Sequence, residues 1–267
     1  MPTTRVTRRG FLYISITGLI AAPLTSVATR LRIHVVIPSS RTELLRGALF
    51  GIEEAQRTVA LMGGTVSMIR HEQVDDIGAG FATGTLTGLI GGNDAESLSR
   101  LAQRAGGQVP VMNVGATANE LRAAHCGDSV FHIAASDAML TSAARKATIA
   151  GARMASWHPS LFRYGAEQLN DRFRARFRET PGMSDDAWCS WMAVKILSDA
   201  ALRSRATTNV ELIEWMSLPR ARFDGHKGVA LTFDGRRQLR QPLYALAADG
   251  TVQSEIAPAP PVEEPCS

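Results

Sequence analysis

The chain has 267 residues, of which 45% are hydrophobic and 20% are charged, a composition typical of a globular protein and not of a disordered one. Its formal net charge is +4 at pH 7. Arg5, Arg8 and Arg9 contribute to this charge from the first 28 residues, which hold no acidic residue, so the rest of the chain is close to neutral. Because no segment concentrates positive charge, we predict no nucleic-acid partner.

Residues 1–28 have the pattern of an export signal. "TRRGFL" at 7–12 places an arginine pair ahead of a short apolar run, and "SVA" at 26–28 offers small residues to a signal peptidase. The run is too short and too interrupted to span a bilayer. The arginine pair followed by Phe-Leu resembles a twin-arginine signal, although an ordinary secretory signal could also hold two arginines. We therefore predict export to the periplasm.

The next part of the chain alternates strand and helix patterns. Short apolar or β-branched runs predict four strands, at 31–38, 65–72, 86–92 and 109–116. Apolar residues at steps of three and four predict helices at 42–62 and 95–106. Strands separated by helices form βαβ units, so we predict an α/β fold with a doubly wound parallel sheet. The glycine-rich link at 73–85 leaves little room for a crossover helix, so either that helix is very short or the strand order differs there.

The second half of the chain is different in kind. Helical spacing predicts an amphipathic helix with a basic outer face, and its apolar side holds Phe162, Ala166, Leu169, Phe173 and Phe177. Ser184 is placed to cap the next helix, which would bury Trp188 and Trp191. Thr208 and Glu211 have capping-box spacing for a third helix. Asp-Gly pairs at 224, 234 and 249 favour tight reversals, so the remaining strands are predicted to be antiparallel.

The three cysteines are Cys126, Cys189 and Cys266. An odd number leaves at least one thiol outside any intramolecular pair. Cys126 and Cys189 could form a disulfide in an oxidising periplasm or remain buried thiols. Cys266 lies in a tail rich in proline and acidic residues, which we expect to be disordered.

No catalytic signature stands out. "HEQVD" at 71–75 begins like the helix of zinc proteases, but Asp75 stands where a second histidine is needed. "GAGFATG" at 78–84 loosely resembles a dinucleotide loop but opens no evident long helix. The sequence has no Gly-x-Ser-x-Gly elbow and no phosphate-binding P-loop. We predict a non-enzyme without metal or cofactor. A catalytic role would need His158 within reach of Asp137 or Cys126.

Small polar residues follow three of the predicted strands. In a doubly wound sheet, ligands collect where the strands end, so these residues are the candidate ligand contacts: Ser39, Ser40, Asn93, Asp94, Gly115, Ala116 and Thr117. The alternative for each polar residue is that it only caps a helix. The convergence of three loops on one edge favours the ligand interpretation.

Several stretches together resemble a known family. "LRIHVVIPSS", "LIGGNDAESLSRLAQ", "VPVMNVGATANELR" and "SVFHIAASDAML", with the later helix pair and "FDGHKGVALTFDGRRQLRQPLYALAADGTV", resemble the branched-chain amino acid class of type I periplasmic binding proteins. More narrowly, "NVGATANELR" and "SWHPSLFRYGAEQLNDRFRARF" resemble the binding proteins of PQQ-dependent alcohol dehydrogenase systems. The resemblance implies a two-lobed protein that holds a small solute, amino acid-like or a small carboxylate, and delivers it to an ABC permease.

The chain departs from this family at 147–151, where most of the second-lobe sheet is missing. The resemblance then implies a signal peptide at 1–28, a first α/β lobe at 29–135, a reduced α+β second lobe at 136–256 and a disordered tail at 257–267. A reduced second lobe cannot close around a solute in the usual hinged way.

Trp157 and His158 precede the arginine-rich helix. In the resembled family this stretch lies near the hinge and cleft, so both residues are candidate ligand contacts; alternatively, they pack beneath the helix. Two functions stay open. The first is a periplasmic solute-binding component of an ABC transport system, which the narrower resemblance associates with PQQ-dependent alcohol oxidation. The second is an interaction protein that docks periplasmic alcohol-oxidation proteins and presents an exposed apolar patch.

Overall fold

The computed structural model describes residues 28–147, 149 and 151–258. The expected signal peptide, apart from Ala28, and most of the expected C-terminal tail lie outside these residues. Among the helices of the described residues, none combines the length and the apolar character needed to cross a membrane.

A five-stranded parallel sheet forms the centre of the molecule, in the order β2-β1-β3-β4-β5. Its strands are β1 (Arg30–Val36), β2 (Thr65–His71), β3 (Leu86–Gly91), β4 (Val111–Asn113) and β5 (Val130–His132). The link from β2 to β3 passes over β1 and contains only the 3-10 turn η1 (Val74–Asp76). Both alternatives for the glycine-rich link are therefore confirmed: the crossover is short, and the strand order changes there.

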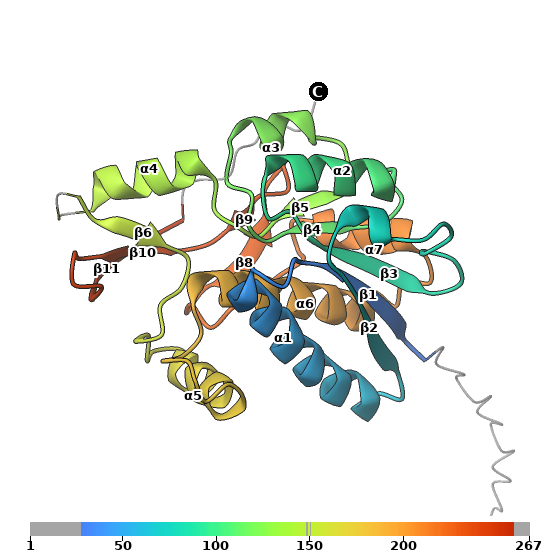
Figure 1. Cartoon of the computed structure of the whole chain (residues 1–267), viewed down its shortest axis with the longest axis horizontal. Helices are drawn as coiled ribbons and strands as arrows, with labels where there is room; N and C mark the ends of the chain where they lie inside the picture. Colours follow the sequence, from blue (N-terminus) through green and yellow to red (C-terminus); the bar gives the residue numbers. More distant parts are fainter. Residues whose placement is uncertain (1–27, 148, 150, 259–267) are drawn as a thin grey trace, which may run out of the picture.

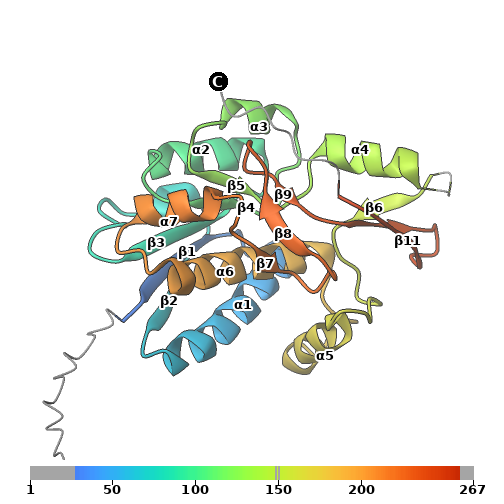
Figure 2. The same cartoon turned by 180° about the vertical axis from the view of Figure 1, so that it is seen from behind.

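Helices cover both faces of this sheet (Figures 1 and 2). One face packs against α1 (Thr42–Leu61), α6 (Asp185–Ser204) and α7 (Asn209–Ser217), and the other against α2 (Ala95–Ala105) and α3 (Glu120–Ala124). The predicted doubly wound α/β fold is confirmed. The predicted caps are confirmed as well, because the Ser184 hydroxyl accepts the Ala187 N–H and Thr208 forms a capping box with Glu211.

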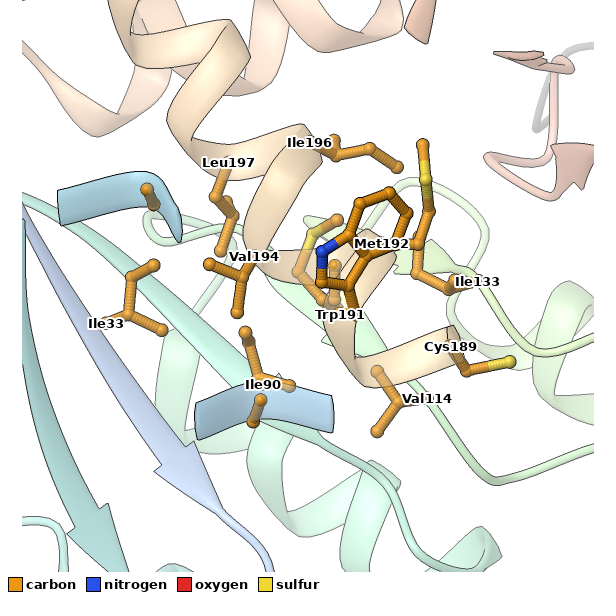
Figure 3. Close-up of a cluster of buried hydrophobic side chains, with 14 of the residues drawn as sticks. Ile33, Ile90, Val114, Ile133, Cys189, Trp191, Met192, Val194, Ile196 and Leu197 are labelled. Atoms are coloured by element: carbon orange, nitrogen blue, oxygen red, sulfur yellow. The ribbon is translucent and has the colours of Figure 1, made fainter. Parts of the chain in front are cut away.

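The larger core lies between the sheet and α6 (Figure 3). Trp191, Val194 and Leu197 of α6 belong to the same buried cluster as the sheet residues Ile33 and Ile90. Helix α1 can approach α6 closely because Gly47 faces the backbone of α6, where a Cβ would overlap the Ala187 carbonyl. The two helices and the sheet thus form one closely packed apolar unit.

A second, smaller sheet lies beside the first, in the order β11-β10-β6. It consists of β6 (Arg153–Ala155), β10 (Leu243–Leu246) and β11 (Val252–Ile256), and α4 (Asp137–Lys146) packs on it. A third sheet joins β7 (Phe223–Asp224), β8 (Ala230–Phe233) and β9 (Leu239–Arg240). All these pairings are antiparallel, as the Asp-Gly pairs predicted. Strand β6 was not predicted, because three residues carry too little periodicity.

The structure corrects the predicted start of the arginine-rich helix. The arginine-rich helix is α5 (Ala166–Arg176), and Phe162 precedes it with an exposed fraction of 67%. Tyr164 and Gly165 have φ of 56° and 81°, a left-handed backbone that stops the helix from extending back to Phe162.

The cysteine pairing is also corrected. Cys126 is disulfide-bonded, whereas Cys189 is a free, buried thiol. Cys189 lies on α6 and Cys126 follows α3, on opposite faces of the sheet. A disulfide between Cys126 and Cys189 is therefore wrong.

Candidate functional site

The carboxyl ends of the parallel strands lie along one edge, here called the carboxyl edge. The register pairs Val35 of β1 with Ile90 of β3, and Gly91 of β3 with Asn113 of β4, so the loops after these three strands begin side by side. A Cβ on Gly115 would lie 3.1 Å from the Gly92 carbonyl oxygen. The loops after β3 and β4 are thus in contact, and glycine is what allows them to approach.

The loop after β1 is occupied by a carboxylate of the chain itself. The Ser39 N–H and hydroxyl donate to Glu72, at 2.7 and 2.6 Å, and Arg70 Nη2 lies 2.6 Å from the Ser39 hydroxyl. The hydrogen bonds from Ser39 lower the pKa of Glu72, with Arg70 adding to the effect. Ser40 is exposed, and no hydrogen bond of its hydroxyl occurs among the described residues. At the β1 end of the edge, Ser39 is therefore satisfied internally, whereas Ser40 faces solvent.

In the loop after β3, the adjacent residues Asn93 and Asp94 have different roles. Asp94 is the N-cap of α2, and its carboxylate accepts the Ser97 N–H at 2.8 Å, so the capping alternative holds for Asp94. The Oδ1 atom of Asn93 is buried and has no hydrogen-bond partner among the described residues. A buried polar atom without a partner is costly, so Asn93 is suited to meet a ligand.

The loop after β4 is held from inside by Asn113. Its Oδ1 accepts the N–H groups of Gly115 and Ala116, at 3.3 and 2.9 Å, and its Nδ2 donates to the Ala116 carbonyl at 2.8 Å. The Thr117 carbonyl accepts the Asp137 N–H at 2.9 Å. No hydrogen bond of the Thr117 hydroxyl occurs within the described residues. Of the candidate side chains on this edge, Asn93 and Thr117 in the contacting loops, and the exposed Ser40, thus keep hydrogen-bonding capacity.

Arg122 fixes the same loops from below. The side chain is 5% exposed, and its guanidinium donates to the carbonyls of Ala116, Ala118 and Ala134 and to Gln238 Oε1, at 2.9 to 3.0 Å. Burial lowers the pKa of Arg122 to about 10, and the nearby carboxylates of Asp137 and Asp234 oppose this. Sequence patterns gave no sign of this role.

Trp157 lies in the core and not at the carboxyl edge. Its exposed fraction is 1%, its Nε1 donates to Asn170 Oδ1 at 3.2 Å, and its ring stacks on Trp188 with centroids 5.9 Å apart. These contacts favour the packing alternative for Trp157. His158 is half-buried, and its Nδ1 lies 2.8 Å from the Ser160 hydroxyl. Burial, then Arg153, lowers the pKa of His158.

The remaining sequence motifs have structural roles. His71 of "HEQVD" stacks on His34, with the two facing ring nitrogens 2.9 Å apart. No group of three or more His, Cys, Asp or Glu side chains that could hold a metal ion occurs in the described part of the chain. His158 bonds Ser160, and Cys126 is disulfide-bonded, so these residues do not form the nucleophile and base of a catalytic pair.

Sequence reasoning also missed a buried polar cluster at the junction of the two main sheets. Lys227, Gln241 and Asp185 lie there, next to Ser156. The one signal in the sequence was compositional: Lys227 is one of only three lysines in a chain rich in arginine.

No protein-family model and no curated protein matches this chain. Its structure is similar to that of the branched-chain amino acid transporter substrate-binding protein LivJ from Streptococcus pneumoniae in complex with isoleucine, at 12% identity and a TM-score of 0.65, covering 87% of this chain and 100% of that one. It is also similar to a leucine-, isoleucine-, valine-, threonine- and alanine-binding protein from Brucella ovis, at 11% identity and a TM-score of 0.67, covering 90% of this chain and 99% of that one. A solute-binding protein from R. palustris in complex with benzoate matches at 12% identity and a TM-score of 0.63, covering 90% of this chain and 99% of that one. The chain therefore has the predicted type I periplasmic binding-protein fold.

Proposed function

We propose that this chain is a periplasmic solute-binding component of an ABC transport system. The observation that supports the proposal is the buried Asn93 Oδ1 atom, which has no hydrogen-bond partner among the described residues, beside the half-buried Thr117 on the contacting loop after β4. In sheets of this kind ligands bind outside the carboxyl ends of the strands, near the point where the strand order reverses. The order β2-β1-β3 puts that point between β1 and β3.

The chemistry of the edge fits an amino acid-like solute or a small carboxylate. The Asn93 Oδ1 atom can accept a hydrogen bond from an ammonium group, and the Thr117 hydroxyl can donate a hydrogen bond to a carboxylate. Ser39 already shows that this edge holds a carboxylate, because it binds that of Glu72. Since Ser39 is occupied by Glu72, we propose that the loops after β3 and β4 bind the solute. Within the proposal, His158 borders the solute, the second lobe is shortened, and the transported solute belongs to a PQQ-dependent alcohol-oxidation system.

The second candidate function is an interaction protein that docks an exported oxidation system. It is favoured by an exposed aromatic pair, Phe162 at 67% and Tyr164 at 57% exposed. Both side chains line a cavity of about 300 Å³ together with Tyr244. Exposed aromatic residues beside a cavity are typical of surfaces that another molecule covers.

A thermal-shift screen of the protein tests the first proposal. The panel is amino acids, short carboxylates, benzoate, PQQ and metal ions. At a hundredfold excess over Kd, a ligand stabilises by about 2.7 kcal/mol, which raises the Tm of a chain of this size by roughly 5 to 10 °C.

Matched variants locate the site. We expect a saturable shift that Asn93→Ala and Thr117→Ala abolish and Tyr164→Ala preserves. The second function would replace the first if no compound shifted the Tm and if a protein partner bound the wild-type chain but not the Tyr164→Ala variant.

A further inference from the structure

Three connections join the large parallel layer to the small sheet β11-β10-β6. The first runs from the end of β5 to α4 at 133–136, the second leaves β6 at Ser156, and the third runs from β9 to β10 at Gln241 and Pro242. Any movement of the small sheet relative to the carboxyl edge has to change the backbone at all three connections.

A single ammonium group touches two of these connections directly. Lys227 lies after β7 and is fully buried, with an exposed fraction of 0%. Its Nζ donates to the Ser156 carbonyl, to Gln241 Oε1 at 2.7 Å and to the Pro242 carbonyl at 3.0 Å. An ammonium has three protons, and each of them has one acceptor here.

Gln241 extends the contact to the remaining connection. While its Oε1 accepts from Lys227, its Nε2 donates to the Ile133 carbonyl at 2.8 Å. Lys227 and Gln241 therefore tie all three connections into one buried hydrogen-bonded cluster. Buried clusters in which every member is satisfied are rigid, because the loss of one member leaves others unpaired.

Two aromatic rings and nearby acidic groups partly offset the cost of burying the Lys227 ammonium. Its Nζ lies 4.0 Å from the centre of the Trp188 ring and 5.3 Å from that of Tyr244, and aromatic faces attract cations. Burial lowers the pKa of Lys227 to about 7, while the charges of Asp185, Cys189 and Glu255 oppose this. The Asp185 carboxylate accepts the Ser156 N–H at 3.0 Å and so holds the second connection from its other side.

The choice of lysine is itself informative. Lysine occurs only at 146, 195 and 227, so arginine supplies nearly all the positive charge of this chain. A guanidinium presents its donors in a flat fork, whereas an ammonium directs three donors outward around one point. Three acceptors from two separate segments around one atom fit the second geometry.

We propose that Lys227 and Gln241 are positioning residues that clamp the three connections and hold the small sheet in a fixed place beside the carboxyl edge. The connection that contains Trp157 and His158 is then fixed in place. Under the proposed function, a solute would bind a preformed surface without closure of the lobes. The clamp is a property of the unliganded chain. Its test needs no solute, and its failure is distinguishable from failure of the proposed function.

Hydrogen exchange followed by mass spectrometry on the full chain tests the clamp. In Lys227→Met, we expect exchange at 133–136, 155–158 and 241–243 to accelerate together by about tenfold or more, with little change in β1 and β3. In Gln241→Leu, only 133–136 should accelerate, because Lys227 keeps its bonds to Ser156 and Pro242. Lys195→Met is the matched control, since Lys195 forms an ordinary pair with Asp199 on α6, and it should leave all three connections unchanged.

Lys227→Arg separates charge from geometry. If the clamp depends on three donors around one atom, the arginine variant should exchange as fast as Lys227→Met at the three connections. Full protection in the arginine variant would overturn the proposal. So would unchanged rates in Lys227→Met, acceleration in β1 and β3 as large as that at the connections, or equal acceleration of all connections in Gln241→Leu. If Lys227→Met does not fold, Lys227→Arg and Gln241→Leu still test the proposal.

Discussion

Replacing Arg122 by methionine should loosen the loops that form the candidate site. The guanidinium makes four hydrogen bonds, three to backbone carbonyls and one to Gln238. Methionine fills a similar volume without any donor. All three carbonyls keep another donor, because Ala116 also accepts from Asn113, Ala134 from Gln238 and Ala118 from the Leu121 N–H. The Gln238 Oε1 atom loses the hydrogen bond from Arg122 Nε.

The expected cost follows from this count. At about 1 kcal/mol net for each hydrogen bond, four bonds give a loss of about 4 kcal/mol in the free energy of unfolding. Urea denaturation at pH 7 measures it as a lower midpoint at unchanged slope. Arg100→Met is the control, because Arg100 is paired with Asp75 at the surface and should cost less than about 1 kcal/mol. A loss below about 1 kcal/mol in Arg122→Met would refute the assignment of Arg122 as the support of these loops.

Three further changes test the fold. Ser184→Ala removes the cap that accepts the Ala187 N–H and should cost about 1 kcal/mol in urea unfolding; an unchanged midpoint would contradict it. Gly47→Ala puts a Cβ onto the Ala187 carbonyl and should cost about 3 kcal/mol, whereas Gly78→Ala, with open space around it, should be tolerated. Burial, then Arg122, lowers the pKa of His132 from 6.5 to about 2, so between these values the unfolded chain binds a proton that the folded chain does not. Stability should fall as pH drops below 6.5, and His132→Gln should flatten this decline by up to about 1.4 kcal/mol per pH unit; parallel curves would rule out the neutral, buried form.

The sequence was sufficient for the elements whose patterns are long or chemically specific. The helix at 42–61 repeats its apolar face over five turns, and the caps at Ser184 and Thr208 lie where their side-chain chemistry requires. The parallel sheet followed from the alternation of strands and helices. These features depend on neighbouring residues, which a single sequence displays directly.

Features that depend on distant partners could not be read from the sequence. Nothing in the sequence pattern set Arg122 or Lys227 apart as buried residues, because carbonyls that bind them belong to remote segments. Trp157 looked like a possible ligand contact until its partners Asn170 and Trp188 were placed. Ser39 resembled an open ligand contact, but its partner Glu72 comes from the neighbouring strand.

The carboxyl edge divides into two unequal halves. At the β1 end, Ser39 is saturated by Glu72 and Arg70, so a solute carboxylate there would have to displace a carboxylate that already has the same hydrogen bonds. At the β3 and β4 end, Asn93 and Thr117 face no such competitor, and Asn113 and Arg122 hold their loops rigid from below. Rigid loops lose little entropy when a ligand binds. Under the two proposals, a chain whose connections are clamped at Lys227 would gain affinity for its solute from such preorganised loops and not from closure of a second lobe.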